Sequence, residues 1–286
     1  IAAGVRTAGC ERVPATMYLD FYGFREPPFS LTPDPRFLFL SDRHREALDA
    51  LLFGIRERKG FIQITGEVGA GKTTLCRAAL ERLGSEVRTA LVLNPMLTPT
   101  QLLRGILQEL GLTPGRADRA SYLDQLNQFL LDAVADGQSV VLLIDEAQDL
   151  SPELLEQVRL LSNLETDQHK LLQIVLVGQP ELRAMLDDPG LRQLRQRITV
   201  RYHLGPLSRL ESDHYIRYRL GIAGVEGRPS LSRAALWRIH RYARGVPRLI
   251  NALCDTTLLC GYVDGTDDLR LGHVRRAVRE LEGRRR

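Results

Sequence analysis

Residues 66–73 read Gly66-Glu67-Val68-Gly69-Ala70-Gly71-Lys72-Thr73, which matches the pattern G-x-x-x-x-G-K-[ST]. A short apolar run at residues 61–65 comes before this stretch, and a helical pattern continues from it to residue 83. Glycines let the backbone adopt positive φ and approach a phosphate closely, and the N-terminus of the following helix attracts the same anion. The sequence therefore predicts a strand, a phosphate-binding loop and a helix.

The side chains of this loop indicate binding of a nucleoside triphosphate together with Mg²⁺. Lys72 supplies a compact positive charge for the β- and γ-phosphates, and the Thr73 hydroxyl is a ligand for Mg²⁺. We expect the loop and the first turn of its helix to hold the nucleotide. The expected contacts come from Gly66, Glu67, Val68, Gly69, Ala70, Gly71, Lys72, Thr73 and Thr74.

An acidic pair follows a second buried run about 70 residues further on. Residues 140–144 are all branched and apolar, and Asp145 and Glu146 come directly after them. We expect Asp145 to join Thr73 in the Mg²⁺ sphere and Glu146 to polarise a water molecule for attack on the γ-phosphate. The sequence has no N-K-x-D element that would read guanine, so ATP is the expected nucleotide.

Strand and helix patterns alternate through the first two thirds of the chain. Strands are expected at residues 61–65, 89–93, 139–144, 172–177 and 198–204, which predicts βαβ units and a parallel sheet. After residue 205 the pattern changes to helices at 208–220, 232–243, 248–262 and 271–282, with no convincing strand. We therefore expect an unstructured extension at 1–16, an α/β nucleotide-binding domain at 17–205 and a small helical domain at 206–286.

Composition and charge argue against a membrane-spanning protein and against one stabilised by disulfides or a structural metal. The chain is 44% hydrophobic and 26% charged, and no apolar run approaches the roughly 20 residues of a membrane helix. Its four cysteines have no paired spacing, which favours a reduced cytosolic protein without a structural metal. The net charge of +4 is concentrated at the end, because residues 269–286 hold seven arginines against two glutamates. A basic pI is thus weak support for nucleic-acid binding.

An aromatic segment near the start needs a packing partner. Seven of the chain's 16 Phe and Tyr residues lie between Tyr18 and Phe39, interleaved with four prolines. Leaving so much apolar surface in water is unfavourable, so we expect this segment to pack onto the nucleotide-binding domain.

Motifs spread over residues 17–283 together resemble one family. They are Phe21-Tyr22-Gly23-Phe24, Pro28-Phe29, Pro33-Asp34-Pro35, the loop at 66–73, Asp145-Glu146-Ala147-Gln148, Val177-Gly178-Gln179-Pro180 and Gly245-Val246-Pro247-Arg248. This set resembles the ExeA-like AAA+ ATPases, which include the general secretion pathway A proteins and pilus-biogenesis relatives such as MshM. The resemblance implies an AAA+ P-loop fold: a five-stranded parallel sheet in the order 5-1-4-3-2, flanked by helices and followed by a helical lid.

The resemblance also implies catalytic roles for residues outside the loop. Asn94 occupies the place of a polar switch that holds Glu146 away from water, and Gln179 that of a sensor for the γ-phosphate. Arg197 fits the arginine finger that one subunit offers to its neighbour's ATP, with Arg195 as the alternative.

Two further positions are implied to contact the nucleotide. Arg248, at the start of a lid helix, fits a second sensor that couples nucleotide state to the lid, and Tyr22 is expected to border the adenine. For every arginine the competing interpretation is an ordinary solvated charge on a helix.

The resemblance favours a Mg²⁺-dependent ATPase that oligomerises around ATP and drives assembly of a secretion or pilus-type machine. The alternatives are a DNA-associated ATPase of the transposition-helper or initiator type, and a slow nucleotide-gated switch. The expected location is cytoplasmic, or peripheral to the inner membrane through a partner or a missing C-terminal region. General secretion pathway A proteins continue into a membrane helix and a peptidoglycan-binding region that these 286 residues lack, which suggests a truncated chain or a stand-alone relative.

Overall fold

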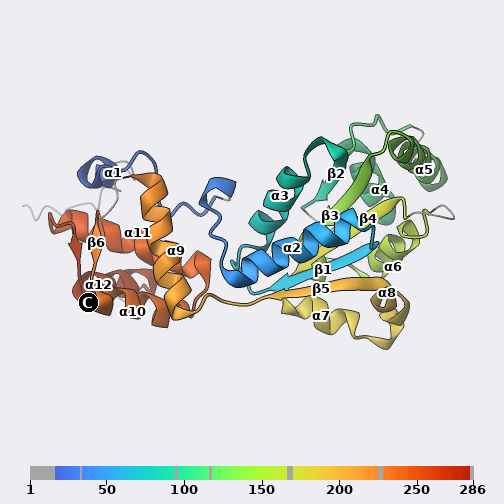
Figure 1. The fold of residues 1–286 in the computed structure, drawn as a ribbon. Coiled ribbons are helices and arrows are strands. Elements are labelled where there is room, and N and C mark those ends of the chain that lie inside the picture. The colour runs from blue at the N-terminus through green and yellow to red at the C-terminus, as the bar shows by residue number, and fades with distance from the viewer. Residues whose placement is uncertain are drawn as a thin grey trace, which may run out of the picture. The chain divides into compact units, whose positions relative to one another are not determined.

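The computed structural model describes residues 17–32, 34–93, 96–115, 118–165, 170–224 and 228–283. These residues divide into two compact units, which are drawn in Figure 1. The sheet unit contains Thr32–Glu211 and Arg244–Arg248, and the helical unit contains the described residues up to Leu31, Ser212–Ala243 and those from Leu249 onward.

Five parallel strands form the centre of the sheet unit, in the order β2-β3-β4-β1-β5 (Figure 1). Their bounds are β1 Phe61–Gly66, β2 Val87–Val92, β3 Ser139–Ile144, β4 Leu172–Gly178 and β5 Ile198–Leu204. The three inner strands are buried almost throughout, as their continuous branched apolar runs require, and the two edge strands are partly exposed. The predicted fold class and strand order are confirmed.

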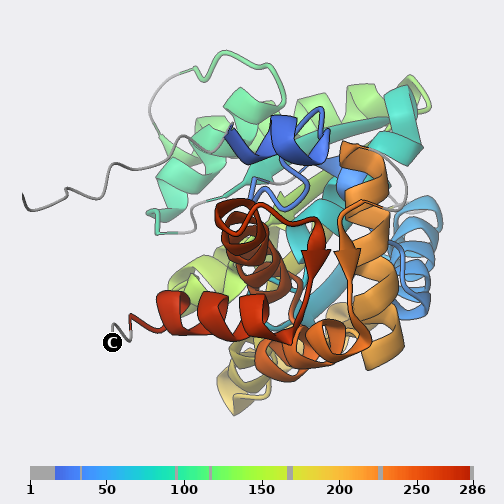
Figure 2. The same ribbon diagram turned by 90° about the vertical axis from the view of Figure 1, so that its left-hand side faces the viewer.

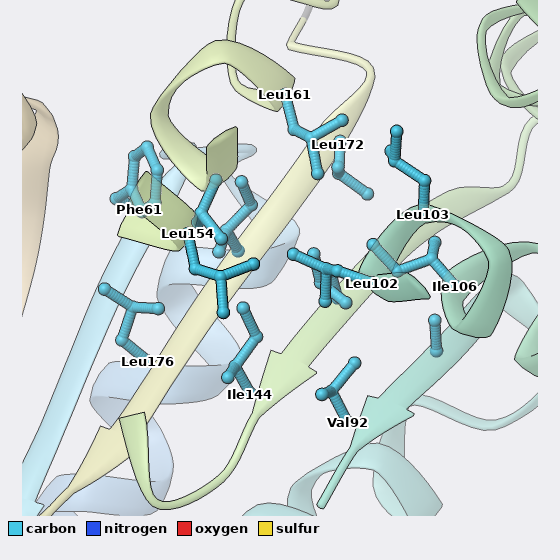
Figure 3. Close-up of a cluster of buried hydrophobic side chains, with 14 of the residues drawn as sticks. Phe61, Val92, Leu102, Leu103, Ile106, Ile144, Leu154, Leu161, Leu172 and Leu176 are labelled. Carbon is cyan, nitrogen blue, oxygen red and sulfur yellow. The ribbon is translucent and has the colours of Figure 1, made fainter. Parts of the chain in front are cut away.

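Helices cover both faces of this sheet. One face is covered by α2 (Asp42–Arg56) and α3 (Lys72–Leu83). The other face is covered by α4 (Pro99–Glu109), α5 (Arg119–Ala135), α6 (Pro152–Leu161), α7 (Pro180–Leu186) and α8 (Arg192–Arg197). Figure 3 shows part of the second layer, where Leu102 and Leu154 pack against Ile144 of the sheet. Alternate residues of each strand thus serve two separate cores.

The helical unit is built from α1 (Met17–Tyr22), α9 (Arg209–Ala223), α10 (Arg233–Ala243), α11 (Pro247–Val263) and α12 (Leu271–Leu281). The first residues of α9 and α11 belong to the sheet unit. Two short parallel strands, β6 (Ser230–Leu231) and β7 (Asp268–Leu269), lie side by side in this unit (Figure 2). The expectation of no strand after residue 205 is therefore wrong, because two-residue strands are too short to produce an alternating pattern.

The first part of the aromatic segment, from Tyr18 to Phe29, packs within the helical unit, whereas Phe37 and Phe39 belong to the sheet unit. Tyr22 is only 3% exposed, and its hydroxyl donates to the Leu258 carbonyl at 2.9 Å, while the Tyr18 hydroxyl donates to the Asp255 carboxylate at 2.6 Å. Arg219 donates from Nε to the Pro28 carbonyl at 2.6 Å and so ties the following loop to α9. We expected the whole segment to pack on the nucleotide-binding domain; the hydrogen bonds place Tyr18, Tyr22 and Pro28 with α9 and α11 instead.

The two units also divide the chain at points other than the expected boundaries. Residues 17–31 group with the helices rather than with the sheet, and the later division falls between Glu211 and Ser212 instead of near residue 205. In addition, Arg244–Arg248 returns to the sheet unit from within the later part of the chain. None of the helices in the described ranges has both the length and the apolar character needed to cross a bilayer.

The returning segment depends on Gly245, which leads to a prediction. Gly245 has φ +77°, and an added Cβ would lie 2.0 Å from the Leu207 carbonyl oxygen. Gly245→Ala should lower the free energy of unfolding by more than about 3 kcal/mol, because the clash adds to the cost of about 1–2 kcal/mol for left-handed backbone. Gly137→Ala is the matched control, since Gly137 has φ +73° and no atom within 4 Å of the added Cβ. Denaturant unfolding measures both, and equal losses would contradict the role of this contact.

Candidate functional site

The phosphate-binding loop connects the end of β1 at Gly66 with the start of α3 at Lys72. Gly69 and Gly71 have φ of 77° and 93°, values that side chains rarely allow. The Ala70 N–H donates to the Glu67 carbonyl at 3.1 Å and closes the turn. Glu67 and Val68 form its exposed tip, while Ala70 and Lys72 are buried. Loop and helix therefore have the geometry that the motif predicts.

Arg248 lies directly against this loop. Its backbone N–H donates to the Gly69 carbonyl at 3.3 Å, and a Cβ on Gly69 would lie 2.3 Å from the Cβ of Arg248. Gly69 is thus required twice, for its positive φ and for this close approach. The side chain of Arg248 is exposed. Arg248, the expected second sensor, therefore lies beside the loop that is expected to bind the nucleotide.

Lys72 is held by the carbonyls of its own loop. Its ammonium donates to the Gly66 oxygen at 2.9 Å and the Glu67 oxygen at 3.1 Å, and the residue is 6% exposed. Burial lowers the pKa of Lys72, and the nearby Glu146 and Asp145 carboxylates act in the opposite direction. These carboxylates favour the charged ammonium that binding a phosphate requires.

Thr73 and Asp145 meet at the carboxyl ends of β1 and β3. The Thr73 hydroxyl donates to Asp145 Oδ2 at 2.6 Å, and the Asp145 N–H donates to the Val92 carbonyl at 2.9 Å. Asp145 is 6% exposed. A hydroxyl and a carboxylate are hard oxygen ligands of the kind that Mg²⁺ prefers, and Mg²⁺ usually takes few protein ligands together with substrate phosphates. This pair therefore fits a Mg²⁺ site.

Glu146 is held by two glutamine amides. Its Oε2 accepts from Gln148 Nε2 at 2.9 Å and from Gln179 Nε2 at 3.3 Å. Its backbone has φ 50°, an uncommon left-handed conformation for a glutamate. Both amides bond the same oxygen, so the carboxylate is fixed in orientation.

Gln148 is a site residue that we did not single out from the sequence. Its Oε1 accepts from the Gln179 N–H at 2.9 Å while its Nε2 holds Glu146, so one side chain links the catalytic candidate to the expected sensor. The short helical turn η3 (Ala147–Asp149) brings it back toward the strand ends. Gly178 is needed here, because a Cβ on it would lie 2.8 Å from Gln148 Oε1. Its place in the Asp145–Gln148 motif is the only signal that the sequence offers.

His44 of α2 is a second residue that sequence reasoning missed. It is 4% exposed, and its ring nitrogens lie 3.2 Å from the Ala70 carbonyl oxygen and 2.7 Å from Ser41 Oγ. A carbonyl only accepts, so Nε2 carries the hydrogen toward Ala70 and Nδ1 accepts from the Ser41 hydroxyl. His44 thereby holds the loop at Ala70. The two residues are 26 positions apart, so no local motif reveals this contact.

The structure does not bring either finger candidate to this loop. Arg197 precedes β5, whose first residue pairs with Phe61 at the opposite end of β1 from the loop. Five residues of strand separate the two ends, or about 16 Å. Arg197 donates to Asn163 Oδ1 at 2.6 Å and to Ser162 Oγ, while Arg195 pairs with Asp187 at 3.0 Å. Arg197 thus lies near the end of β1 that is opposite the loop.

Two other expected residues have different outcomes. Asn94 lies outside the described residues. Tyr22 belongs to the helical unit, where packing and two backbone carbonyls account for its burial, so its contact with adenine stays a prediction.

Comparison with known proteins gives matches of two kinds. The sequence model described as an AAA domain matches residues 55–186. General secretion pathway protein A of Aeromonas hydrophila is 47% identical over 268 residues, which are 93% of this chain and 49% of that protein. The chain thus spans about half the length of this relative.

Solved structures share the fold at low sequence identity. The Aeropyrum pernix ORC2 protein, in its ADPNP and ADP complexes, is 20% identical with a TM-score of 0.70, covering 92% of this chain and 74% of that one. The Thermotoga maritima RuvB Holliday junction branch migration motor is 19% identical with a TM-score of 0.57, covering 85% and 69%. These likenesses support the fold alone.

The buried His44 makes a prediction about pH. Burial lowers the pKa of His44 in the folded chain, and the Ala70 carbonyl and Glu211 act weakly against it. As the pH falls below about 6.5, the unfolded chain therefore takes up a proton that the folded chain resists. The contribution of His44 to the free energy of unfolding is complete above about pH 7.5 and decreases below it.

Denaturant unfolding of the wild type and His44→Gln at several pH values measures this contribution. The difference between the two should shrink by up to about 1.4 kcal/mol per pH unit below pH 6.5. A difference that is constant from about pH 8 to pH 5 would contradict it.

Proposed function

We propose that this chain, which is similar to general secretion pathway protein A and matches an AAA domain, is an ATPase that binds and hydrolyses ATP with Mg²⁺ to drive assembly of a secretion or pilus-type machine. The observation that carries the proposal is the 2.6 Å contact between Thr73 and Asp145, close to which Lys72 interacts electrostatically with both Asp145 and Glu146. This arrangement unites a phosphate-binding loop, two oxygen ligands and a carboxylate base.

Binding of the triphosphate begins at the loop. Backbone N–H groups between Gly69 and Thr73 and the N-terminus of α3 offer donors and a positive dipole to the phosphates. Lys72 exchanges its bonds to the Gly66 and Glu67 carbonyls for bonds to phosphate oxygens. Thr73 and Asp145 would hold Mg²⁺, which neutralises charge that develops on the phosphates.

Hydrolysis depends on the orientation of Glu146. One carboxylate oxygen accepts from both amides, which leaves Oε1 to accept a proton from the attacking water. Gln148 joins this carboxylate to the backbone of Gln179, so a shift of the sensor at the γ-phosphate moves the base as well. Arg248, whose backbone and side-chain stem lie against Gly69, adds a positive charge beside the loop.

Oligomerisation follows from the position of Arg197. In its own chain this arginine lies about 16 Å along β1 from the loop, so a finger role requires a second subunit. The relative's name points to protein secretion as the process served, and the remodelled partner is then a component of that machine. The proposed location is the cytoplasm, peripheral to the inner membrane through this partner.

Glu146→Gln tests the chemistry. The variant should bind ATP with unchanged affinity, release phosphate at least 100-fold more slowly, and accumulate ATP-bound oligomers, because the amide cannot accept a proton. Calorimetry, phosphate release and light scattering give the three readings, and Lys72→Ala, which should lose ATP binding, is the control. Normal turnover in Glu146→Gln would remove the proposed base.

A subunit-mixing experiment tests the trans geometry. Arg197→Ala and Lys72→Ala are each expected to be inactive alone, yet mixed oligomers pair an intact loop with an intact finger and should recover part of the ATPase rate. Arg192→Ala, an exposed arginine of the same helix, should stay active and serves as the control. Failure to recover activity while both variants fold and co-assemble would contradict a finger at Arg197, and recovery with Arg195→Ala instead would assign the role there.

A further inference from the structure

A second concave site lies in the sheet unit, on the face of β1 that is opposite α3. It is a cavity of about 360 Å³ between β1, β5, α7 and α8. Its floor includes Gln63 and Thr65 of β1, and its wall includes Arg201 and His203 of β5. None of its lining residues belongs to the phosphate-binding loop or the acidic pair.

Positive charge converges on this cavity from three elements. Arg183 of α7, Arg195 of α8 and Arg201 of β5 all line it, and Asp187 is the one carboxylate among its lining residues. Asp187 pairs with Arg195 at 3.0 Å. In the described part of the chain, Arg183 and Arg201 have no carboxylate partner. Arg201 donates to the Arg195 carbonyl, which leaves its charge uncompensated.

The floor holds an amide that the cavity leaves accessible. Gln63 is 5% exposed as a whole, it lines the cavity, and its side chain makes no hydrogen bond with any described residue. Its amide atoms are not among the fully buried unpaired atoms of the described residues, so they can reach a ligand in the cavity. Beside it, His203 Nδ1 lies 3.1 Å from Thr65 Oγ1, so the other ring nitrogen of His203 is available to the cavity. The buried floor thus offers hydrogen-bonding groups below a positively charged rim.

We infer that this cavity binds a small phosphorylated anion, separately from the ATP site. Guanidinium groups pair with phosphate oxygens through two parallel N–H donors, and in the described residues no carboxylate competes for Arg183 or Arg201. The volume is at the lower end of the range for small-molecule pockets, which suits a phosphate ester or pyrophosphate. The Gln63 amide completes the site by donating to the same oxygens from below.

Calorimetric titration with inorganic pyrophosphate tests this inference. The full chain carrying Lys72→Ala is used, so that the phosphate-binding loop contributes nothing and the result is independent of whether the chain hydrolyses ATP. We expect one saturable site per chain. Arg183→Gln and Arg201→Gln should each raise the dissociation constant at least tenfold. The matched control Arg192→Gln removes an exposed charge of α8 outside the cavity and should change it less than twofold.

Gln63→Leu separates binding from structure, because only binding should respond to it. It should raise the dissociation constant threefold or more and yet leave the melting temperature of the ligand-free chain unchanged, since the Gln63 side chain makes no hydrogen bond with a described residue that the substitution would remove. A loss of thermal stability, with binding unchanged, would show a structural role and overturn the assignment.

Three other results would overturn the inference as well. The first is absence of saturable binding, and the second is equal weakening by Arg192→Gln, which would indicate diffuse charge. The third is citrate binding as tightly as pyrophosphate, which would exclude phosphate selectivity. If duplex DNA binds through Arg183 and Arg201 while pyrophosphate does not bind, the ligand of this cavity is a nucleic acid and the inference of a small anion is overturned.

Discussion

The parallel alignment of β1, β3 and β4 is the constraint on which the site depends. Ile64 pairs with Val177 and Ile144 with Leu176, so the three strands end at one edge of the sheet. The phosphate-binding loop, the acidic pair and Gln179 follow these ends directly. Without this register the 2.6 Å contact between Thr73 and Asp145, which are 72 positions apart, could not form.

Local patterns were sufficient to predict the sheet and part of the site. The loop glycines and the apolar run before Asp145 each specify backbone geometry within a few residues, so their structure follows from nearby sequence. Gln148 and His44 were missed because their roles arise from contacts between an amide or imidazole and groups on other elements. Arg197 was assigned by family resemblance, and its geometry adds only that it lies far from its own loop.

The aromatic segment shows a different limit of sequence reasoning. Its composition correctly required burial, yet apolar area is non-directional and does not specify the surface that covers it. The hydrogen bonds of Tyr18, Tyr22 and Arg219 decide the packing of its first part, because they join residues 18–28 to α11 and α9. These partners lie more than 180 positions away, beyond the reach of any periodicity. The helical unit is therefore assembled from both ends of the described chain.

At Glu146, backbone stability and the proposed catalytic role favour different residues. At φ 50° a glycine would relax the chain by about 1 kcal/mol, whereas a glutamate is mildly strained there. A substitution that relieves this strain would also remove the carboxylate on which the proposed hydrolysis depends, so a more stable backbone and the proposed base cannot be combined at this position.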